Sequence, residues 1–168
     1  MTMPPTLEFW YEFASTYSYL SVMRAPKIAE AAGVTLTWKP FLLGPIFAAQ
    51  GWNDSPFKLF PVKGVYMWRD MERLAADLEL PLRRPSVFPR NGLHAARVAI
   101  TFADPRPFTQ AVFHANFAED RSTEKPEVLA EILTDLGHDA AAALEAANAP
   151  ANKDALRLQT EAAMQRGV

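Results

Sequence analysis

The chain of 168 residues contains no cysteine. Disulfide bonds and zinc–thiolate sites are therefore excluded, and the protein has no thiol nucleophile of its own. Its three histidines, His94, His114 and His138, are far apart in the sequence and lack the spacing of metal ligands. We expect no metal site, and chemistry that needs a thiol would require another molecule to supply it.

Long hydrophobic runs and an excess of basic residues are also missing. No stretch of about 18 apolar residues occurs, so we expect no membrane span. The formal net charge of −2 shows no excess of basic residues for binding nucleic acid. The sequence also lacks the glycine-rich loop that would indicate nucleotide binding. The N-terminal residues lack the pattern of a secretory signal, so a cytoplasmic location is expected. With 49% hydrophobic and 21% charged residues, the composition fits one globular domain with room for an insertion.

What is present begins with a strand–helix–strand pattern. Residues 7–13, LEFWYEF, form an aromatic-rich run that is typical of a buried strand. A helix capped by Ser15 or Thr16 follows, and Pro26 inside it is expected to kink or divide it. Residues 34–40 alternate in polarity and predict a second strand. A crossover of this length predicts that the two strands are parallel.

Helical periodicity dominates the rest of the chain. Residues 44–56 are rich in turn formers and predict a loop. Beyond them, apolar residues recur at helical spacing, and we expect helices over about residues 62–80, 91–100, 108–117 and 126–136, a short one from residue 139, and a last one over 152–166. The predicted fold class is therefore α/β, with a βαβ unit followed by a block of helices.

Two serines, Ser15 and Ser18, stand three residues apart where the first helix begins. A helix N-terminus carries unpaired N–H groups and a partial positive charge, and thioredoxin-like proteins place Cys-x-x-Cys there because this field stabilises a thiolate. A serine hydroxyl cannot exchange with disulfides. It can donate a hydrogen bond, worth about 1.5–3 kcal/mol, to a thiolate that another molecule brings. The alternative is an ordinary helix cap with a neighbouring serine.

Four strings, FWYEFASTYSYLS, WKPFLLGPIF, YMWRDMERLAADLELPL and PSVFPRN, occur in an order and spacing that resemble 2-hydroxychromene-2-carboxylate isomerases. These are glutathione-dependent enzymes of the DsbA-like, kappa-class glutathione transferase group. The resemblance runs along essentially the whole chain and implies a thioredoxin-like fold with a helical insertion domain. Residues 1–45 and 150–168 would form the thioredoxin-like part, and residues 46–149 the insertion. The family continues past the equivalent of Val168, so the C-terminal strands of the thioredoxin-like part are expected to be missing from this chain.

The resemblance also implies roles for single residues. The family's catalytic serine falls on Ser15, which would hold the sulfur of glutathione as a thiolate. Asn53, in the string GWNDSP, and Lys63 fall on positions that contact glutathione, with Lys63 as a counter-charge to its carboxylate. Asn91 falls on a position that lines the substrate pocket. Lys63 also suits a solvated helix start, and Asn91 also suits a helix cap.

Aromatic residues would complete the implied substrate pocket. Trp52 lies in the loop on the glutathione side and is a candidate for an aromatic-substrate wall or for the core. Phe47, Tyr66 and Phe88 would extend the same apolar wall. Glu12 stands where many members of the family have aspartate, and the resemblance leaves its role open.

The implied reaction is the glutathione-dependent conversion of 2-hydroxychromene-2-carboxylate to trans-o-hydroxybenzylidenepyruvate in aromatic degradation, with glutathione regenerated. Lys63 or Arg90 would meet the carboxylate of this aromatic substrate. One alternative is a kappa-like glutathione transferase or peroxidase that acts on other electrophiles. A second is a non-catalytic thioredoxin-like module that binds a partner, and a third is an inactive fragment. A two-stranded sheet leaves an open edge, so we expect a homodimer or cover from the insertion.

Overall fold

Two parallel strands, β1 (Thr6–Tyr11) and β2 (Thr35–Pro40), form the sheet in the computed structural model, which describes residues 4–168. Phe9 lies beside Trp38 in the register, and their rings meet edge to face with centroids 5.0 Å apart. Residues 7–11 of the aromatic-rich run therefore pair with the second strand, and the strand ends two residues before the run does. This arrangement confirms the predicted strand–helix–strand unit.

The crossover helix α1 (Thr16–Ala31) begins at the N-cap Ser15 and runs past Pro26 without a break. Because proline has no N–H, the carbonyl of Val22 loses its partner within the helix. The side-chain amide of Gln110 donates a hydrogen bond to this carbonyl at 3.2 Å. The predicted division of the helix at Pro26 is therefore wrong, since a neighbouring element supplies the missing hydrogen bond.

The helices that the periodicity predicts are present, and their ends shift by a few residues. They are α4 (Pro61–Asp77), α5 (Leu93–Ala99), α6 (Arg106–Phe117), α7 (Pro126–Asp135), α8 (Ala140–Asn148) and α9 (Pro150–Arg166). The segment predicted to be a loop contains two short helices, α2 (Leu43–Ala49) and α3 (Pro56–Leu59). That prediction is wrong in part, because Ile46 in α2 is buried against Phe41 and gives the segment an anchor.

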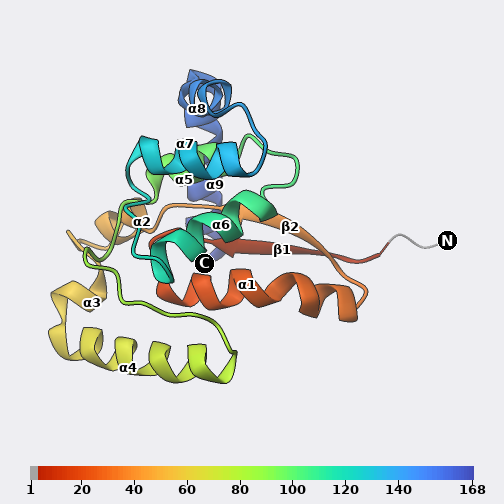
Figure 1. The fold of residues 1–168 in the computed structure, drawn as a ribbon. Coiled ribbons are helices and arrows are strands. Elements are labelled where there is room, and N and C mark those ends of the chain that lie inside the picture. Colours follow the sequence, from red (N-terminus) through yellow and green to blue (C-terminus); the bar gives the residue numbers. More distant parts are fainter. Residues whose placement is uncertain (1–3) are drawn as a thin grey trace.

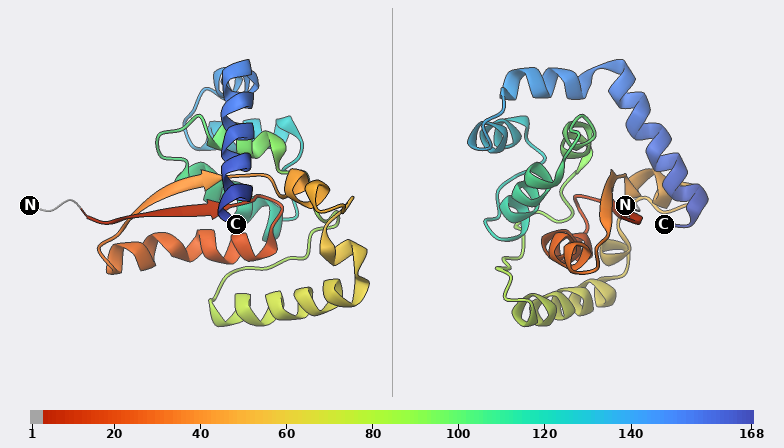
Figure 2. Two further views of the ribbon diagram at one scale, coloured as in Figure 1. Left: turned by 180° about the vertical axis from the view of Figure 1, so that it is seen from behind. Right: turned by 90° about the vertical axis from the view of Figure 1, so that its right-hand side faces the viewer.

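Helices cover the sheet from two sides (Figure 1, Figure 2). On one side, α1 and α6 pack against it: the buried Tyr11 hydroxyl lies 2.9 Å from the Thr109 hydroxyl of α6. The core continues there as a stack of aromatic rings, with Phe13 and Phe113 parallel at 5.2 Å. The carboxyl end of β1 is thereby fixed against the helical block.

On the other side, α9 returns to the sheet (Figure 2). The Gln159 side-chain amide donates to the carbonyl of Pro40 at 2.5 Å, where β2 ends. Further along α9, Arg166 pairs with Glu8 and lies over the Trp10 ring at 5.5 Å. The free edge of β1 pairs with no other strand among residues 4–168. Its pairing with a second copy stays a prediction.

Candidate functional site

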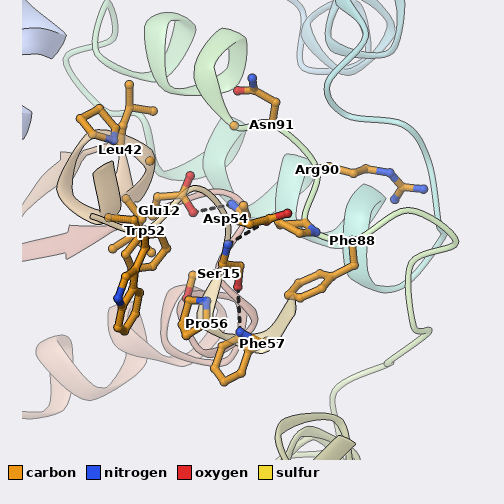
Figure 3. A pocket seen from close by; sticks show the side chains of 18 of the residues that line it. Glu12, Ser15, Leu42, Trp52, Asp54, Pro56, Phe57, Phe88, Arg90 and Asn91 are labelled. Carbon is orange, nitrogen blue, oxygen red and sulfur yellow. Dashed lines mark hydrogen bonds between the residues drawn. The ribbon is translucent and has the colours of Figure 1, made fainter. Parts of the chain in front are cut away.

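The carboxyl end of β1 opens into a pocket of about 530 Å³ (Figure 3). Its walls come from the turn between β1 and α1, from α2, from residues 52–57 and from residues 88–93. Ligands of parallel α/β sheets bind beyond the carboxyl ends of the strands, because the connecting turns there are free to carry side chains. The pocket is therefore where this topology predicts a site.

Ser15 is both a helix cap and a pocket residue. Its backbone is extended, as an N-cap requires, and its Oγ accepts a hydrogen bond from the Ser18 N–H at 3.2 Å. The same side chain lines the pocket. Because the cap uses Oγ as an acceptor, the hydroxyl proton remains available for donation. The prediction that Ser15 caps α1 is confirmed, and its catalytic role stays a prediction.

The second serine of the pair does not line the pocket. Ser18 Oγ accepts a hydrogen bond from the backbone N–H of Glu12 at 3.3 Å, which ties the first turn of α1 to the end of β1. Thr16, between the two serines, has a buried hydroxyl without a partner among residues 4–168. Of the two serine hydroxyls, Ser15 alone faces the cavity, and Ser18 supports the turn.

Glu12 is a pocket residue whose role the sequence leaves open. Its side chain is buried, at 6% exposure, and lines the pocket close to Ser15. Burial raises the pKa of this carboxyl from 4.5 to about 8, and the hydrogen bond that Oε2 accepts from the Ala14 N–H opposes the shift. The carboxyl is therefore largely protonated at neutral pH. An acid at the end of an apolar strand, three residues before the serine, is the signal that could have found it.

Three predicted residues line the pocket from α2 and the loop after it. The rings of Phe47 and Trp52 lie with centroids 5.8 Å apart and form an aromatic wall. Asn53 follows Trp52 directly and lines the same side. The structure thus brings these three residues together with Ser15, and Trp52 belongs to the pocket wall.

Two more predicted residues line the pocket from the segment before α5. The Phe88 ring rests edge to face on Trp68 at 5.0 Å, and the peptide bond between Phe88 and Pro89 is cis. Asn91 lies beside the pocket, and its Oδ1 accepts a hydrogen bond from the Leu93 N–H at 2.9 Å. Asn91 thus holds the first N–H of α5 from one residue before its N-cap, Gly92, and its role in binding a substrate stays a prediction.

Lys63 and Tyr66 do not line the pocket. Both belong to α4, whose face at these positions is turned to the surface. The Lys63 ammonium lies over the ring of Phe60 at 4.7 Å, and Tyr66 is 69% exposed. The predicted placement of Lys63 beside glutathione and of Tyr66 in the substrate wall does not match these positions, because the rotation of α4 is set by its packing.

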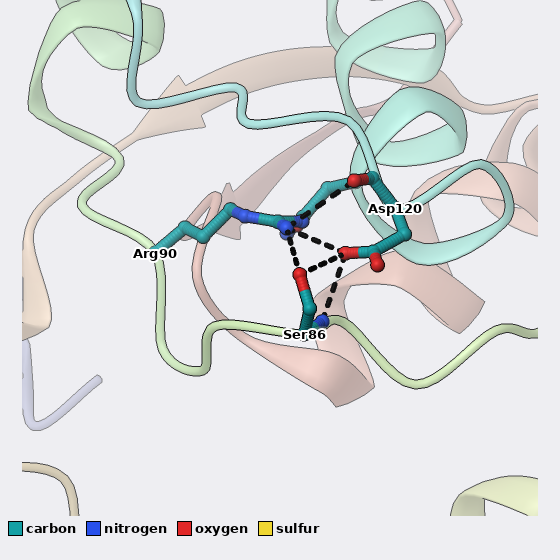
Figure 4. Close-up of polar contacts among 4 residues, drawn as sticks. Ser86, Arg90 and Asp120 are labelled. Atoms are coloured by element: carbon teal, nitrogen blue, oxygen red, sulfur yellow. Dashed lines mark hydrogen bonds and ion pairs between the residues drawn. The ribbon is translucent and has the colours of Figure 1, made fainter.

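Arg90 lines the pocket with part of its chain, but its guanidinium is directed elsewhere (Figure 3, Figure 4). The side chain is 2% exposed, and its Nη atoms donate to Asp120 at 2.5 Å and to Asn116 at 2.8 Å. Hydrogen bonds from Ser86 and from Arg90 lower the pKa of Asp120 to about 2. The expectation that Arg90 meets a substrate carboxylate is not met, because the guanidinium is already paired.

The ionisable residues that line the pocket are few: Glu12, Asp54 and Arg90. Asp54 pairs with Lys58 at 3.2 Å.

Residues 4–168 contain no cluster of histidine and acidic side chains that could hold a metal ion. Within the same residues, no helix combines the length and the apolar character that crossing a membrane requires.

A family model described as a DSBA-like thioredoxin domain matches residues 6–168. A 2-hydroxychromene-2-carboxylate isomerase from Sphingobium xenophagum is 29% identical over 168 residues, covering 99% of this chain and 86% of that protein. Glutathione S-transferase kappa 1 from Homo sapiens is 26% identical, covering 98% of this chain and 78% of that one. Among solved structures, a 2-hydroxychromene-2-carboxylate isomerase superposes with a TM-score of 0.86 at 25% identity, covering 97% of this chain and 81% of the other.

Proposed function

Because this chain belongs to the family of DSBA-like thioredoxin domains, we propose that it is a glutathione-dependent isomerase that converts 2-hydroxychromene-2-carboxylate to trans-o-hydroxybenzylidenepyruvate. The name of the relative from Sphingobium xenophagum supports the choice of substrate. The single observation that carries the proposal is Ser15. It presents a hydroxyl to the pocket at the N-terminus of α1, in a chain without any thiol.

The residues of the pocket suit glutathione. The Ser15 hydroxyl is free to donate, and the N-terminus of α1 adds a partial positive charge beside it, so an anionic sulfur is favoured there. Asn53, another lining residue, carries an amide that can donate or accept a hydrogen bond. The pocket volume lies within the range of small-molecule sites, about 300–1,000 Å³. When bound, glutathione supplies the sulfur nucleophile that the chain lacks.

The chain's own side chains would orient the aromatic substrate and exclude water from it. Phe47 and Trp52 on one side and Phe88 on another give the pocket apolar surface that suits a planar ring system. Ser15 would keep the sulfur in its anionic form through a charge-assisted hydrogen bond. Because the ammonium of Lys63 and the guanidinium of Arg90 are directed elsewhere, the field at the N-terminus of α1 is the positive feature that remains beside Ser15.

Replacing Ser15 tests the proposal. We expect Ser15→Ala to lower glutathione-dependent turnover of 2-hydroxychromene-2-carboxylate by about 10- to 100-fold, the kinetic equivalent of one charge-assisted hydrogen bond. The thiolate absorbance of bound glutathione, followed against pH, should show a higher thiol pKa in the variant. Turnover that stays at the wild-type level would remove Ser15 from the mechanism.

The variant also loses a helix cap, which costs about 1 kcal/mol of stability by itself. Asp139→Ala is the matched control, because Asp139 caps α8 with a hydrogen bond to the Ala142 N–H and does not line the pocket. Both variants should lose similar stability, and only Ser15→Ala should lose turnover. An equal loss of turnover in the two would point to a folding effect.

A second candidate function is that of a kappa-class-like glutathione transferase or peroxidase, which the human relative's name supports. It would use the same pocket and the same Ser15. A panel of electrophiles and hydroperoxides separates the two functions. Turnover of the panel without turnover of 2-hydroxychromene-2-carboxylate would favour the transferase.

A further inference from the structure

Glu12 and Ser15 stand at the two ends of one tight turn. The Ser15 N–H donates to the Glu12 carbonyl at 3.0 Å, which closes a four-residue turn between β1 and α1. Such a turn holds the Cα atoms of its first and last residues within about 7 Å of each other. Both side chains line the pocket (Figure 3). Whatever molecule contacts the Ser15 hydroxyl therefore lies within reach of a carboxyl group.

The two oxygens of this carboxyl have different surroundings. Oε2 accepts a hydrogen bond from the Ala14 N–H at 2.9 Å, so this oxygen is held as an acceptor. Oε1 makes no hydrogen bond to any group of residues 4–168 and lies against Gly92, where an added Cβ would come within 3.0 Å of it. A proton on the carboxyl is thus best placed on Oε1, the oxygen whose hydrogen-bonding capacity is unused.

No charged side chain offsets the burial of Glu12. Of the other ionisable groups lining the pocket, Asp54 is paired with Lys58, and the Arg90 guanidinium is paired with Asp120. Neither group forms a hydrogen bond or an ion pair with Glu12. Burial therefore dominates, and it raises the pKa of Glu12 to about 8. A carboxylic acid kept neutral in this way can act as a proton donor.

Resting on the function proposed above, we propose that Glu12 is the general acid of this pocket. When bound, glutathione would supply the nucleophilic sulfur, and its addition would place an electron pair on a second atom of the substrate. Glu12 would give the Oε1 proton to that atom and become a carboxylate. On formation of the product with release of glutathione, the same carboxylate would take the proton back. The isomerisation therefore leaves Glu12 and glutathione as they were, and no other reactant is consumed.

The test compares the wild type with Glu12→Gln, which keeps the size and neutrality of the acid form but has no proton to transfer. We expect kcat to fall by about 100-fold, the lower end of the range for general acid catalysis. In the wild type, kcat/KM should decline as the pH rises through about 8, because the acid form is lost. Glu12→Gln should lack this alkaline decline, and Glu12→Asp should restore part of the turnover together with the decline. Unchanged turnover in Glu12→Gln, or an unchanged alkaline decline, would overturn the role of Glu12.

Two readouts without turnover complete the experiment. The carboxyl signal of Glu12 in a ¹³C NMR titration of the free protein, identified by its loss in Glu12→Gln, should have its midpoint near pH 8. A midpoint at the ordinary value of 4.5 would overturn the proposal. Calorimetry should show that Glu12→Gln binds glutathione within a few-fold of the wild type. Failure of the wild type to bind glutathione would overturn the proposed function and this role together. Normal binding of glutathione by the wild type, with unchanged turnover in Glu12→Gln, would overturn this role alone.

Discussion

Ser15 uses the two sides of one hydroxyl group for different purposes. Its oxygen accepts a hydrogen bond from the Ser18 N–H and so fixes the start of α1, while its proton stays free to be donated into the pocket. A thiol at this position would be a weaker cap, because sulfur is a weak acceptor. Helix stability and ligand chemistry are therefore compatible at this residue, and neither interpretation of Ser15 excludes the other.

Burial of Glu12 links the pocket to the stability of the fold. The folded state holds a proton on Glu12 that the unfolded chain releases as the pH rises from 4.5 to about 8. The free energy of unfolding therefore falls across this window and levels off above it, with a total on the order of a few kcal/mol. Residues that are placed for chemistry often cost stability in this way.

Glu12→Gln removes this cost, because an amide does not titrate. We expect the variant to have a higher melting temperature than the wild type above pH 8 and a similar one below pH 4.5, as measured by thermal unfolding followed by circular dichroism. Glu145→Gln is a suitable control, since this acid is exposed on α8 and its side chain makes no hydrogen bond or ion pair among residues 4–168. A variant that gains nothing at alkaline pH would show that Glu12 ionises freely in the folded protein.

At the scale of single residues, the sequence could predict the parts of the pocket that follow from short segments. Ser15, Asn53 and Asn91 each sit where a strand, loop or helix start brings the backbone to the pocket. Lys63 and Tyr66 could not be placed, because their direction depends on how α4 is rotated by its packing. That rotation is set by contacts with residues distant in the sequence.

At the scale of elements, α1 shows why a local rule failed. Pro26 removes the donor for the Val22 carbonyl, and the local expectation is a broken helix. Gln110 lies on α6, far away in the sequence, and donates to that carbonyl in a partly buried environment. Helix continuity here depends on a tertiary hydrogen bond, which propensity and periodicity do not contain.

Gln110→Ala should destabilise the protein by about 1–2 kcal/mol, because it leaves the Val22 carbonyl without a partner. In a Pro26→Ala background, the N–H of residue 26 is restored, and the same replacement should cost clearly less. Urea unfolding of the wild type, both single variants and the double variant gives this coupling energy directly. Equal costs in the two backgrounds would mean that Gln110 acts through packing alone.

The segment between β2 and α4 is a second case at this scale. Its glycines, prolines and polar residues predict a loop, yet α2 and α3 form within it. Ser55 caps α3 by accepting the Phe57 N–H at 3.3 Å, and Ile46 buries one side of α2. The turn residues therefore lie at the ends of two short helices. Helices of seven and four residues are too short for hydrophobic periodicity to reveal them in the sequence.

At the scale of the whole molecule, the order of elements followed from the sequence, and the way they close around the pocket did not. The parallel βαβ unit is fixed by crossover length and handedness. The return of α9 to the sheet depends on scattered contacts such as Gln159 with the Pro40 carbonyl and Arg166 with Glu8. No local pattern in α9 distinguishes these side chains from other polar residues.

The thioredoxin-like fold invites a test for disulfide reduction. We expect this protein to reduce insulin disulfides no faster than glutathione alone, because none of its 168 residues is a cysteine and a hydroxyl cannot exchange with a disulfide. The turbidity assay for insulin reduction measures this directly. Reduction above the glutathione background would contradict the interpretation that the pocket binds the thiol of glutathione and has no redox chemistry of its own.

The hydrogen bond between Gln110 and the Val22 carbonyl has a further consequence for anyone who would shorten this scaffold. Excising residues 46–149 and splicing the two strands directly to α9 would delete the donor that repairs the proline gap in α1. It would also uncover the Tyr11 hydroxyl, which rests on Thr109. A minimal version of the molecule would first need Pro26 and Tyr11 redesigned, because the first 40 residues are already shaped to fit helices encoded much later.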